Sequence, residues 1–283
     1  MNHNHRSNRL LLNYYDACIY ESDLNLLKNS REWLNSACIH FFMMRLQHSN
    51  AATTPGADIF LDPSALSFLM HHCQENDDMM DFCRGQGLTG TEDRVHSRRI
   101  FVPVNDTFGR GSGQYAGDGG MHWSLLVMLQ MVINGPLHDS DNFSCEHYND
   151  TGNSAVFMHF DSSSGMNADA AVSVAKKLNQ AIHCCKWKSG ERDMGNGINH
   201  VCVTACPTLQ QHNGYDCGVY LLAKAEIILE GISVADTLKF RSSSQDVIAS
   251  HYADLICKSS LADDLNYAKE KRQQIVTDIM DLM

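Results

Sequence analysis

One cysteine of this chain lies where the sequence predicts the start of a helix. Residues 211–222 read Gln-His-Asn-Gly-Tyr-Asp-Cys-Gly-Val-Tyr-Leu-Leu, so a polar turn leads through Cys217 into an apolar helical pattern. The unpaired N–H groups and the dipole of a helix N-terminus favour a thiolate over a thiol. We therefore interpret Cys217 as a candidate nucleophile, and Gly214 and Gly218 as a sign that another segment approaches this backbone closely. The alternative is a small buried core residue, the commoner role of a free cysteine.

A base and a carboxylate can be placed beside this nucleophile by pairing two predicted strands. Residues 122–130 and 154–161 are the clearest strand segments, and antiparallel pairing that joins 130 to 153 puts His122 opposite Asp161. A carboxylate beside a histidine fixes its tautomer and stabilises its charged form, as a general base requires. With 15 histidines in the chain, a satisfied surface histidine remains the alternative.

Gln211 stands six residues before Cys217 on the loop that leads to it. Its side-chain amide could join the Cys217 backbone N–H in stabilising the oxyanion formed when a carbonyl is attacked. A solvated loop glutamine is the alternative.

Four strings of the sequence are informative together: Trp33-Leu34-Asn35, His122-Trp123-Ser124-Leu125-Leu126-Val127, Phe160-Asp161-Ser162 and Gln211-x-Asn-Gly-Tyr-Asp-Cys-Gly. This set resembles the sentrin/SUMO-specific family of ubiquitin-like-modifier cysteine proteases, and is closest to its deneddylase branch. The likeness runs from about Leu10 to Ile228. It implies a papain-like or adenain-like fold, with a mixed sheet flanked by helices and the nucleophile at a helix N-terminus.

The resemblance also assigns roles to residues of this chain. It implies His122 as the base, Asp161 as the group that orients it, Cys217 as the nucleophile and Gln211 in the oxyanion hole. Substrate binding would fall to Trp33, Asn35 and Trp123, with the two indoles covering a narrow channel for the Gly-Gly tail of the modifier. One departure is Ser36, where the family usually has Asp, which puts one modifier contact in doubt.

The expected function is cleavage after the C-terminal Gly-Gly of a ubiquitin-like modifier, preferably the neddylation modifier, in precursor processing or release from lysine-linked conjugates. The partners would then be that modifier and its conjugates. A SUMO-specific protease, a modifier-binding module without catalysis, and an acyltransferase with a related Cys-His-acid set remain alternatives. An inactive module would be expected to have lost a triad member, and Trp123 speaks against the acyltransferase.

The remaining pattern predicts a single α+β protease domain over 10–283, after a disordered lead at 1–9. Helices are expected to start at about 34 with Asn35 as cap, at Asp62-Pro63, and after Asn167, and two amphipathic helices to fill 244–257 and 262–281. Short strands are expected at 99–104 and 199–205, and a polar surface insertion at 131–153.

Composition narrows the class of protein. The net charge of −11 and the lack of basic clusters argue against a nucleic-acid partner, and no run is long enough to cross a membrane. The polar start lacks an apolar signal-peptide segment, and the 11 cysteines follow no disulfide framework, so we expect reduced thiols in the cytoplasm or nucleus. No metal or other cofactor is expected, because the cysteines and histidines, such as His71-His72-Cys73, Cys83, Cys184-Cys185 and Cys202-x3-Cys206, lack zinc-site spacing. We also expect a monomer.

Overall fold

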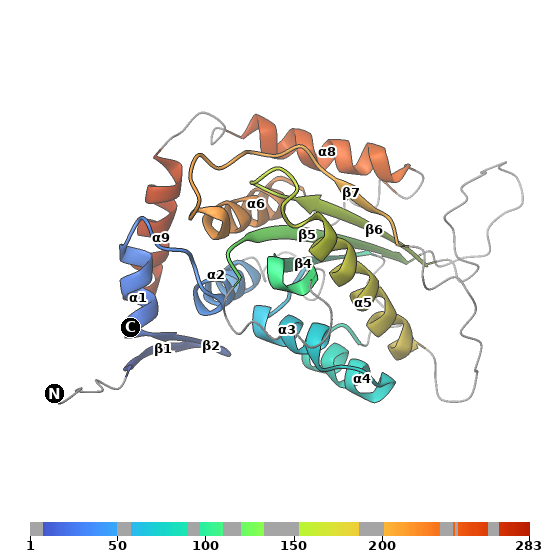
Figure 1. Cartoon of the computed structure of the whole chain (residues 1–283), viewed down its shortest axis with the longest axis horizontal. Helices are drawn as coiled ribbons and strands as arrows, with labels where there is room; N and C mark the ends of the chain where they lie inside the picture. Colours follow the sequence, from blue (N-terminus) through green and yellow to red (C-terminus); the bar gives the residue numbers. More distant parts are fainter. Residues whose placement is uncertain are drawn as a thin grey trace, which may run out of the picture.

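A mixed five-stranded sheet forms the centre of the molecule in this computed structural model (Figure 1). The structure describes residues 8–49, 58–89, 97–109, 120–132, 153–186, 201–232, 240, 243–259 and 266–283. The outer pairs of strands are parallel and the central pairs antiparallel. In spatial order the strands are β3 (Asp58–Phe60), β4 (Ser97–Asn105), β5 (Trp123–Val132), β6 (Asn153–Phe160) and β7 (Val203–Ala205).

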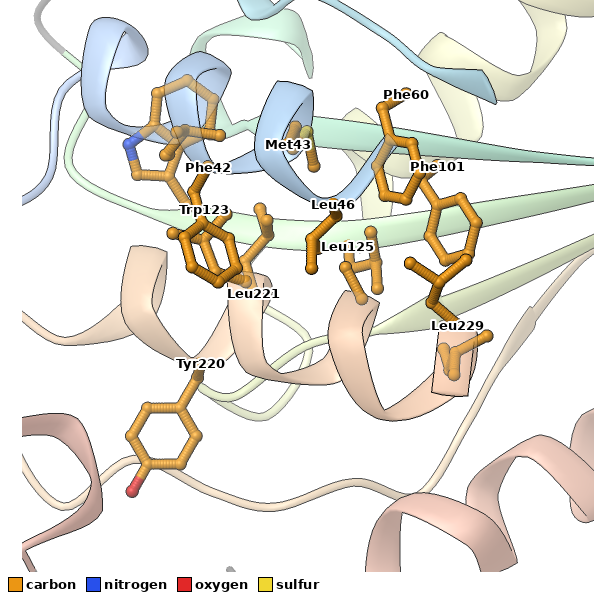
Figure 2. Close-up of a cluster of buried hydrophobic side chains, with 14 of the residues drawn as sticks. Phe42, Met43, Leu46, Phe60, Phe101, Trp123, Leu125, Tyr220, Leu221 and Leu229 are labelled. Atoms are coloured by element: carbon orange, nitrogen blue, oxygen red, sulfur yellow. The ribbon is translucent and has the colours of Figure 1, made fainter. Parts of the chain in front are cut away.

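The central strand β5 is buried on both faces, which explains its continuous apolar run from Leu125 to Leu129. Alternate residues contribute to two separate cores: Leu125, Val127 and Leu129 to one face, Leu126 and Met128 to the other. Figure 2 shows Leu125 in the first core with side chains of two covering helices. That core lies under α2 (Ser36–Ser49), α6 (Cys217–Gly231), α8 (Gln245–Lys258) and α9 (Tyr267–Leu282), and the second under α3 (Pro63–His71), α4 (Asn76–Gly85) and α5 (Ala168–Lys186).

The N-terminal part of the domain contains elements that the sequence pattern did not reveal. A hairpin of β1 (Leu10–Tyr14) and β2 (Ala17–Tyr20) turns at Tyr15 and leads directly into α1 (Glu21–Lys28). Asn8 and Arg9, which the sequence assigned to a disordered lead, hydrogen-bond to Ser22 and to the backbone of Glu21. Residues 1–7 lie outside the described residues. A short 3-10 helix, η1 (Asp106–Gly109), follows β4.

The predicted helix starts are confirmed, and their caps explain them. The Asn35 side chain accepts from the N–H of Cys38, the Asp62 carboxylate accepts from the N–H groups of Ser64 and Ala65, and α5 begins directly after Asn167. Of the two terminal helices, α8 matches its prediction closely, and α9 spans Tyr267–Leu282, whereas the predicted start at 262 lies outside the described residues. None of the described helices is long and apolar enough to cross a membrane.

The predicted register of the β5–β6 pair is wrong by two residues. Gln130 lies opposite Ala155 and Leu125 opposite Phe160, and the last pair joins Val132 to Asn153. The prediction ends the strand at 130, whereas β5 continues through Met131 and Val132. A slip of two preserves which face each side chain points to, so the error did not separate the residues of the site.

Several sequence predictions fall partly outside the described residues. The insertion expected at 131–153 is reduced to 133–152, which are not described. The strand expected at 199–205 is limited to β7, and residues 187–200 before it are not described.

Candidate active site

Cys217 occupies the first position of α6 and is fully buried. Gly218 follows it, and a Cβ at that position would lie 3.0 Å from the Cβ of Leu34. The close approach expected of the flanking glycines is therefore real at Gly218, where the Trp33-Leu34 segment packs against the nucleophile's helix. At Gly214 the approach is to the carbonyl, which accepts from the Trp33 indole N–H, and a Cβ there would meet open space.

His122 and Asp161 form the hydrogen-bonded pair that the sequence predicted, although neither lies within a strand. His122 immediately precedes β5 and Asp161 immediately follows β6, and their Nε2 and Oδ1 atoms are 2.6 Å apart. In the observed register they are diagonal rather than directly opposite neighbours, a spacing that two long side chains can bridge. The backbone N–H groups of Ser163 (2.9 Å) and Asn167 (3.0 Å) donate to the Asp161 carboxylate and fix it in place.

The electrostatics of the pair favour an ion pair at neutral pH. Burial by itself would lower the pKa of His122, but its hydrogen bonds and charge interactions with Asp161 and Cys217 outweigh burial and raise this pKa to about 9. Burial would raise the pKa of Asp161, but the hydrogen bond to His122 and the two backbone N–H groups hold it well below its usual range. The imidazole is thus charged at neutral pH, and Cys217 is one of the groups that keep it so.

A second buried histidine shows how much the carboxylate contributes. His159, on β6, bonds through Nε2 to the Ser124 hydroxyl at 2.9 Å and has no carboxylate in direct contact among the described residues. Burial lowers the pKa of His159 to about 4, so its ring is neutral at pH 7. His159 is therefore a structural histidine of the site, not a second base.

Gln211 is held in one orientation by the loops on either side of it. Its Oε1 accepts from the Ser162 hydroxyl at 2.8 Å, and its backbone N–H donates to the Ser162 carbonyl at 2.9 Å. With Oε1 occupied in this way, the amide nitrogen faces the loop before Cys217, where it donates to the Asn213 carbonyl at 2.5 Å. The Gln211 amide nitrogen therefore lies against the loop that leads to Cys217.

The two tryptophans have different environments. Trp123 is buried and its indole N–H donates to the Leu34 carbonyl at 3.0 Å (Figure 2). Trp33 is 44% exposed, and its indole N–H donates to the Gly214 carbonyl at 2.5 Å. Hydrogen bonds thus connect the Trp33-Leu34 segment both to the nucleophile loop and to the residue beside His122.

The resemblance implies that Asn35 binds substrate, but both the oxygen and the nitrogen of its side-chain amide make hydrogen bonds within the protein. Its Oδ1 caps α2 through Cys38, and its Nδ2 donates to the Asp23 carboxylate at 2.7 Å. These contacts give Asn35 a structural role in joining α1 to α2.

Two residues of the site were not predicted from the sequence as parts of it. The Asn167 amide nitrogen bonds to the carbonyls of Val104 and His122 and to the Ser124 hydroxyl, and Arg272 on α9 pairs with Asp216. Asn167 was recognised only as a helix start. Arg272 carries no local signal, because a charged residue in an amphipathic helix is expected to face water.

The other described cysteines do not share the surroundings of Cys217. Burial raises the pKa of the thiols of Cys38, Cys73, Cys83, Cys184 and Cys206, which favours their neutral form. All cysteines in the described part of the chain are free thiols. Within that part, no group of three or more His, Cys, Asp and Glu side chains is arranged to hold a metal ion.

Comparison with known proteins places these features in a family context. The profile of the Ulp1 protease family, C-terminal catalytic domain, matches residues 32–261. The chain is 29% identical to NEDD8-specific protease 1 of Arabidopsis thaliana over 79% of this chain and 76% of the relative. It is 26% identical to the probable sentrin-specific protease 8 of Dictyostelium discoideum over 98% and 99%, and to sentrin-specific protease 8 of Homo sapiens over 78% and 82%.

Two solved structures are similar in fold. One is a crystal structure of the de-sumoylating protease, with a TM-score of 0.58 and 14% identity, covering 96% of this chain and 92% of the other. The second is the C-terminal Ulp1 protease domain in complex with SMT3, the yeast ortholog of SUMO, with a TM-score of 0.51, 18% identity, and coverage of 98% and 89%. The α+β papain-like arrangement expected from the sequence is confirmed.

Proposed function

The chain belongs to the Ulp1 protease family, and on that basis we propose that it cleaves after the C-terminal Gly-Gly of a ubiquitin-like modifier, with NEDD8 preferred. The family assignment expected from the sequence is confirmed, and the protein is a cysteine protease of this family. The residues that carry the reaction and the identity of the modifier are our proposal.

One observation carries the proposal: the His122–Asp161 pair, whose Nε2 and Oδ1 atoms are 2.6 Å apart, interacts with Cys217 at the first position of a helix, and the pKa of His122 is raised to about 9. A protonated imidazole beside the sulfur stabilises a thiolate, as do the free N–H groups of the first helical turn. The same imidazolium is the acid that a leaving amine needs. A cysteine buried for packing alone would require neither the histidine nor the carboxylate.

The reaction that follows has two steps. The Cys217 thiolate attacks the carbonyl carbon of the last glycine, and His122 gives its proton to the departing amine of lysine or of a peptide. A water molecule, activated by the now neutral His122, then attacks the thioester and releases the modifier and the thiol. In both tetrahedral intermediates the negative oxygen would be stabilised by the Cys217 backbone N–H and the Gln211 amide.

The route of the tail is proposed from the two tryptophans. Trp33 lies on the segment that bonds to the loop of Cys217, and Trp123 adjoins His122, so a chain that passes between them arrives at the catalytic groups. Glycines suit such a passage because they have no side chain to collide with an indole. A pocket of about 330 Å³ borders Trp123 and Ser36 and could take the residues before the glycines; its wall includes Pro63, Ser64, Phe68, Asn105 and Phe108.

The choice of NEDD8 is supported by the relatives and by two local strings. Relatives from Arabidopsis and Schizosaccharomyces pombe carry the name NEDD8-specific protease 1. The strings His122-Trp123-Ser124-Leu125-Leu126-Val127 and Tyr215-Asp216-Cys217 resemble the deneddylase branch. The two tryptophans can accept any Gly-Gly end, so discrimination must come from the modifier's body and the residues just before the glycines. Ser36, which stands where the family usually has Asp, belongs to the pocket at that place.

The test is a comparison of kcat/KM on NEDD8, SUMO and ubiquitin, each carrying the same fluorogenic amide at its C-terminal glycine. We expect NEDD8 to be cleaved fastest and ubiquitin slowest, with Cys217→Ala inactive but still able to bind NEDD8. Faster cleavage of SUMO would overturn the choice of modifier and leave the protease in place. Binding of a modifier without cleavage of any by the folded wild-type protein would instead support a binding module.

A further inference from the structure

We propose that Arg272, on the last helix α9, is a positioning residue of the active site. Its guanidinium joins Asp216, the residue before the nucleophile, to the segment 29–33, which ends in Trp33. We call these two segments the walls of the approach to Cys217, and Arg272 sets the distance between them. The inference rests on the proposed function where it is tested by kcat and KM. Hydrogen–deuterium exchange tests the positioning itself and needs no substrate.

The first contact of Arg272 is to the residue next to the nucleophile. Its Nε and Nη2 atoms donate to the Oδ1 of Asp216 at 3.1 and 2.9 Å, and both side chains are almost completely buried. The other carboxylate oxygen, Oδ2, accepts from Asn213 Nδ2 at 2.7 Å. Asp216 is therefore held from two sides, and Cys217, one peptide bond away, takes its position from it.

The same guanidinium reaches a second segment of the chain. Nη2 donates to the Glu32 carbonyl at 2.5 Å, and Nη1 lies 3.5 Å from the Asn29 carbonyl. Trp33 follows Glu32 directly, and its indole N–H donates to the Gly214 carbonyl, so the two segments are also bonded to each other. Arg272, on α9, thus hydrogen-bonds both to the segment before Trp33 and to the loop 213–216.

Only arginine can make this set of contacts from one side chain. A guanidinium has five donors in a rigid plane, whereas an ammonium is a single charge centre on a flexible stem. Buried charge that merely stabilised the fold could sit anywhere on α9. Here it lies between the two segments that carry Trp33 and Cys217, and it comes from beyond residues 32–261, the part matched by the family profile.

The neighbouring residue Lys271 provides a matched control. It is also on α9, 3% exposed like Arg272, and it forms an ion pair with Glu226 on α6. That pair lies about two and a half turns beyond Cys217 along α6 and touches neither Asp216 nor the Trp33 segment. Removing either cation costs α9 one ion pair of a buried side chain, but only Arg272 contacts Asp216 and the segment before Trp33.

The experiment compares Arg272→Lys, Arg272→Gln and Lys271→Gln with the wild type, at a temperature where circular dichroism shows each protein folded. Hydrogen–deuterium exchange of peptides covering 29–34 and 211–217 reports on the tether, and kcat and KM on the fluorogenic NEDD8 substrate report on catalysis. We expect faster exchange in both peptides for the Arg272 variants alone. We expect kcat to fall about tenfold for Arg272→Lys and about 10²-fold for Arg272→Gln, because small misplacement of reacting groups costs this much. KM should change less than kcat, and Lys271→Gln should leave both constants unchanged.

Each other outcome overturns one of the two ideas. Faster exchange with no loss of kcat, an equal loss of kcat in Lys271→Gln, or failure of both Arg272 variants to fold while Lys271→Gln folds would make Arg272 a residue of stability only. Wild-type exchange rates in both peptides of the Arg272 variants would show that the Arg272 contacts do not hold the segments 29–34 and 211–217 in place. If the wild-type protein cleaves no modifier, the proposed function fails, and exchange alone still decides the role of Arg272.

Discussion

Two buried histidines, one just before β5 and one on β6, differ because of one carboxylate. His122 contacts Asp161 and has its pKa raised to about 9, whereas His159 contacts a hydroxyl and has its pKa lowered to about 4. Burial lowers both, so the direction of the net shift is set by the partner. At the scale of single residues, Asp161 therefore decides which of the two histidines has a raised pKa.

This difference gives a pH dependence that can be measured. If the imidazolium form of His122 is the active one, kcat/KM should fall above about pH 9, as the ring loses its proton. In Asp161→Asn the largest stabilisation of that proton is removed, so the alkaline fall should move to lower pH, together with a loss on the order of 10⁴ in turnover. His159→Gln serves as a control that should leave the position of the alkaline fall unchanged. An alkaline limb that stays in place in Asp161→Asn would contradict the proposed role of the pair.

Gln211 allows a separate test of the oxyanion hole. Gln211→Ala should lower kcat roughly 10²–10³-fold with little change in KM, because the donor acts mainly in the transition state. Ser162→Ala, which removes only the hydroxyl that orients the amide, should give a smaller loss in the same constant. An increase in KM alone would identify Gln211 as a substrate-binding residue.

At the scale of elements, the start of α5 is joined to the ends of two strands by one amide. Asn167 donates from Nδ2 to the carbonyls of Val104 (3.1 Å) and His122 (3.3 Å), and to the Ser124 hydroxyl (3.0 Å), while its backbone N–H reaches Asp161. Figure 1 shows α5 on one face of the sheet with its start near η1. The catalytic pair is therefore positioned where a helix start meets strand ends.

Asn167→Ala should destabilise the fold and the site together. It leaves buried acceptors without their donor, which costs about 1–3 kcal/mol in the free energy of unfolding. We also expect kcat to fall, since the His122 carbonyl loses one of its anchors. Urea unfolding and steady-state kinetics measure both. Ser173→Ala, which removes a hydroxyl on the same helix that bonds only to the Asp169 carbonyl, is the control, and an equal effect there would contradict the assignment.

The sequence allowed the local parts of this site to be predicted, because each lies in a short string. Cys217 at a helix start and Asn35 and Asp62 as caps follow from residues within a few positions of one another, and His122 beside Asp161, 39 residues apart, follows from the pairing of two strands recognised by their apolar runs. The register of β5 and β6 could not be predicted, because the strand continues past the point where the loop was placed. Arg272 was out of reach for a different reason: its partner Asp216 is remote in sequence, and only the packing of α9 brings them together.

At the scale of the whole molecule, the length of β5 and β6 separates the site from the residues that flank the segment 133–152. His122 and Asp161 are at one end of the β5–β6 pair, and Val132 and Asn153 are at the other. At about 3.3 Å per residue, the ten residues of β5 span roughly 30 Å.

This separation predicts that 133–152 can be replaced without loss of the fold or of the catalytic step. Val132 and Asn153 face each other as the last pair of the ladder, which is the geometry that a two-residue Asn-Gly turn closes. A variant with Asn-Gly in place of residues 133–152 should unfold cooperatively and cleave the fluorogenic NEDD8 substrate with the wild-type kcat. As a control, shortening the chain by one residue more, so that Asn153 is also lost, would leave an odd register and should destabilise the pair. An insoluble product from the Asn-Gly variant would show that the replaced segment packs on the core, and a raised KM with normal kcat would show that it contacts the modifier instead.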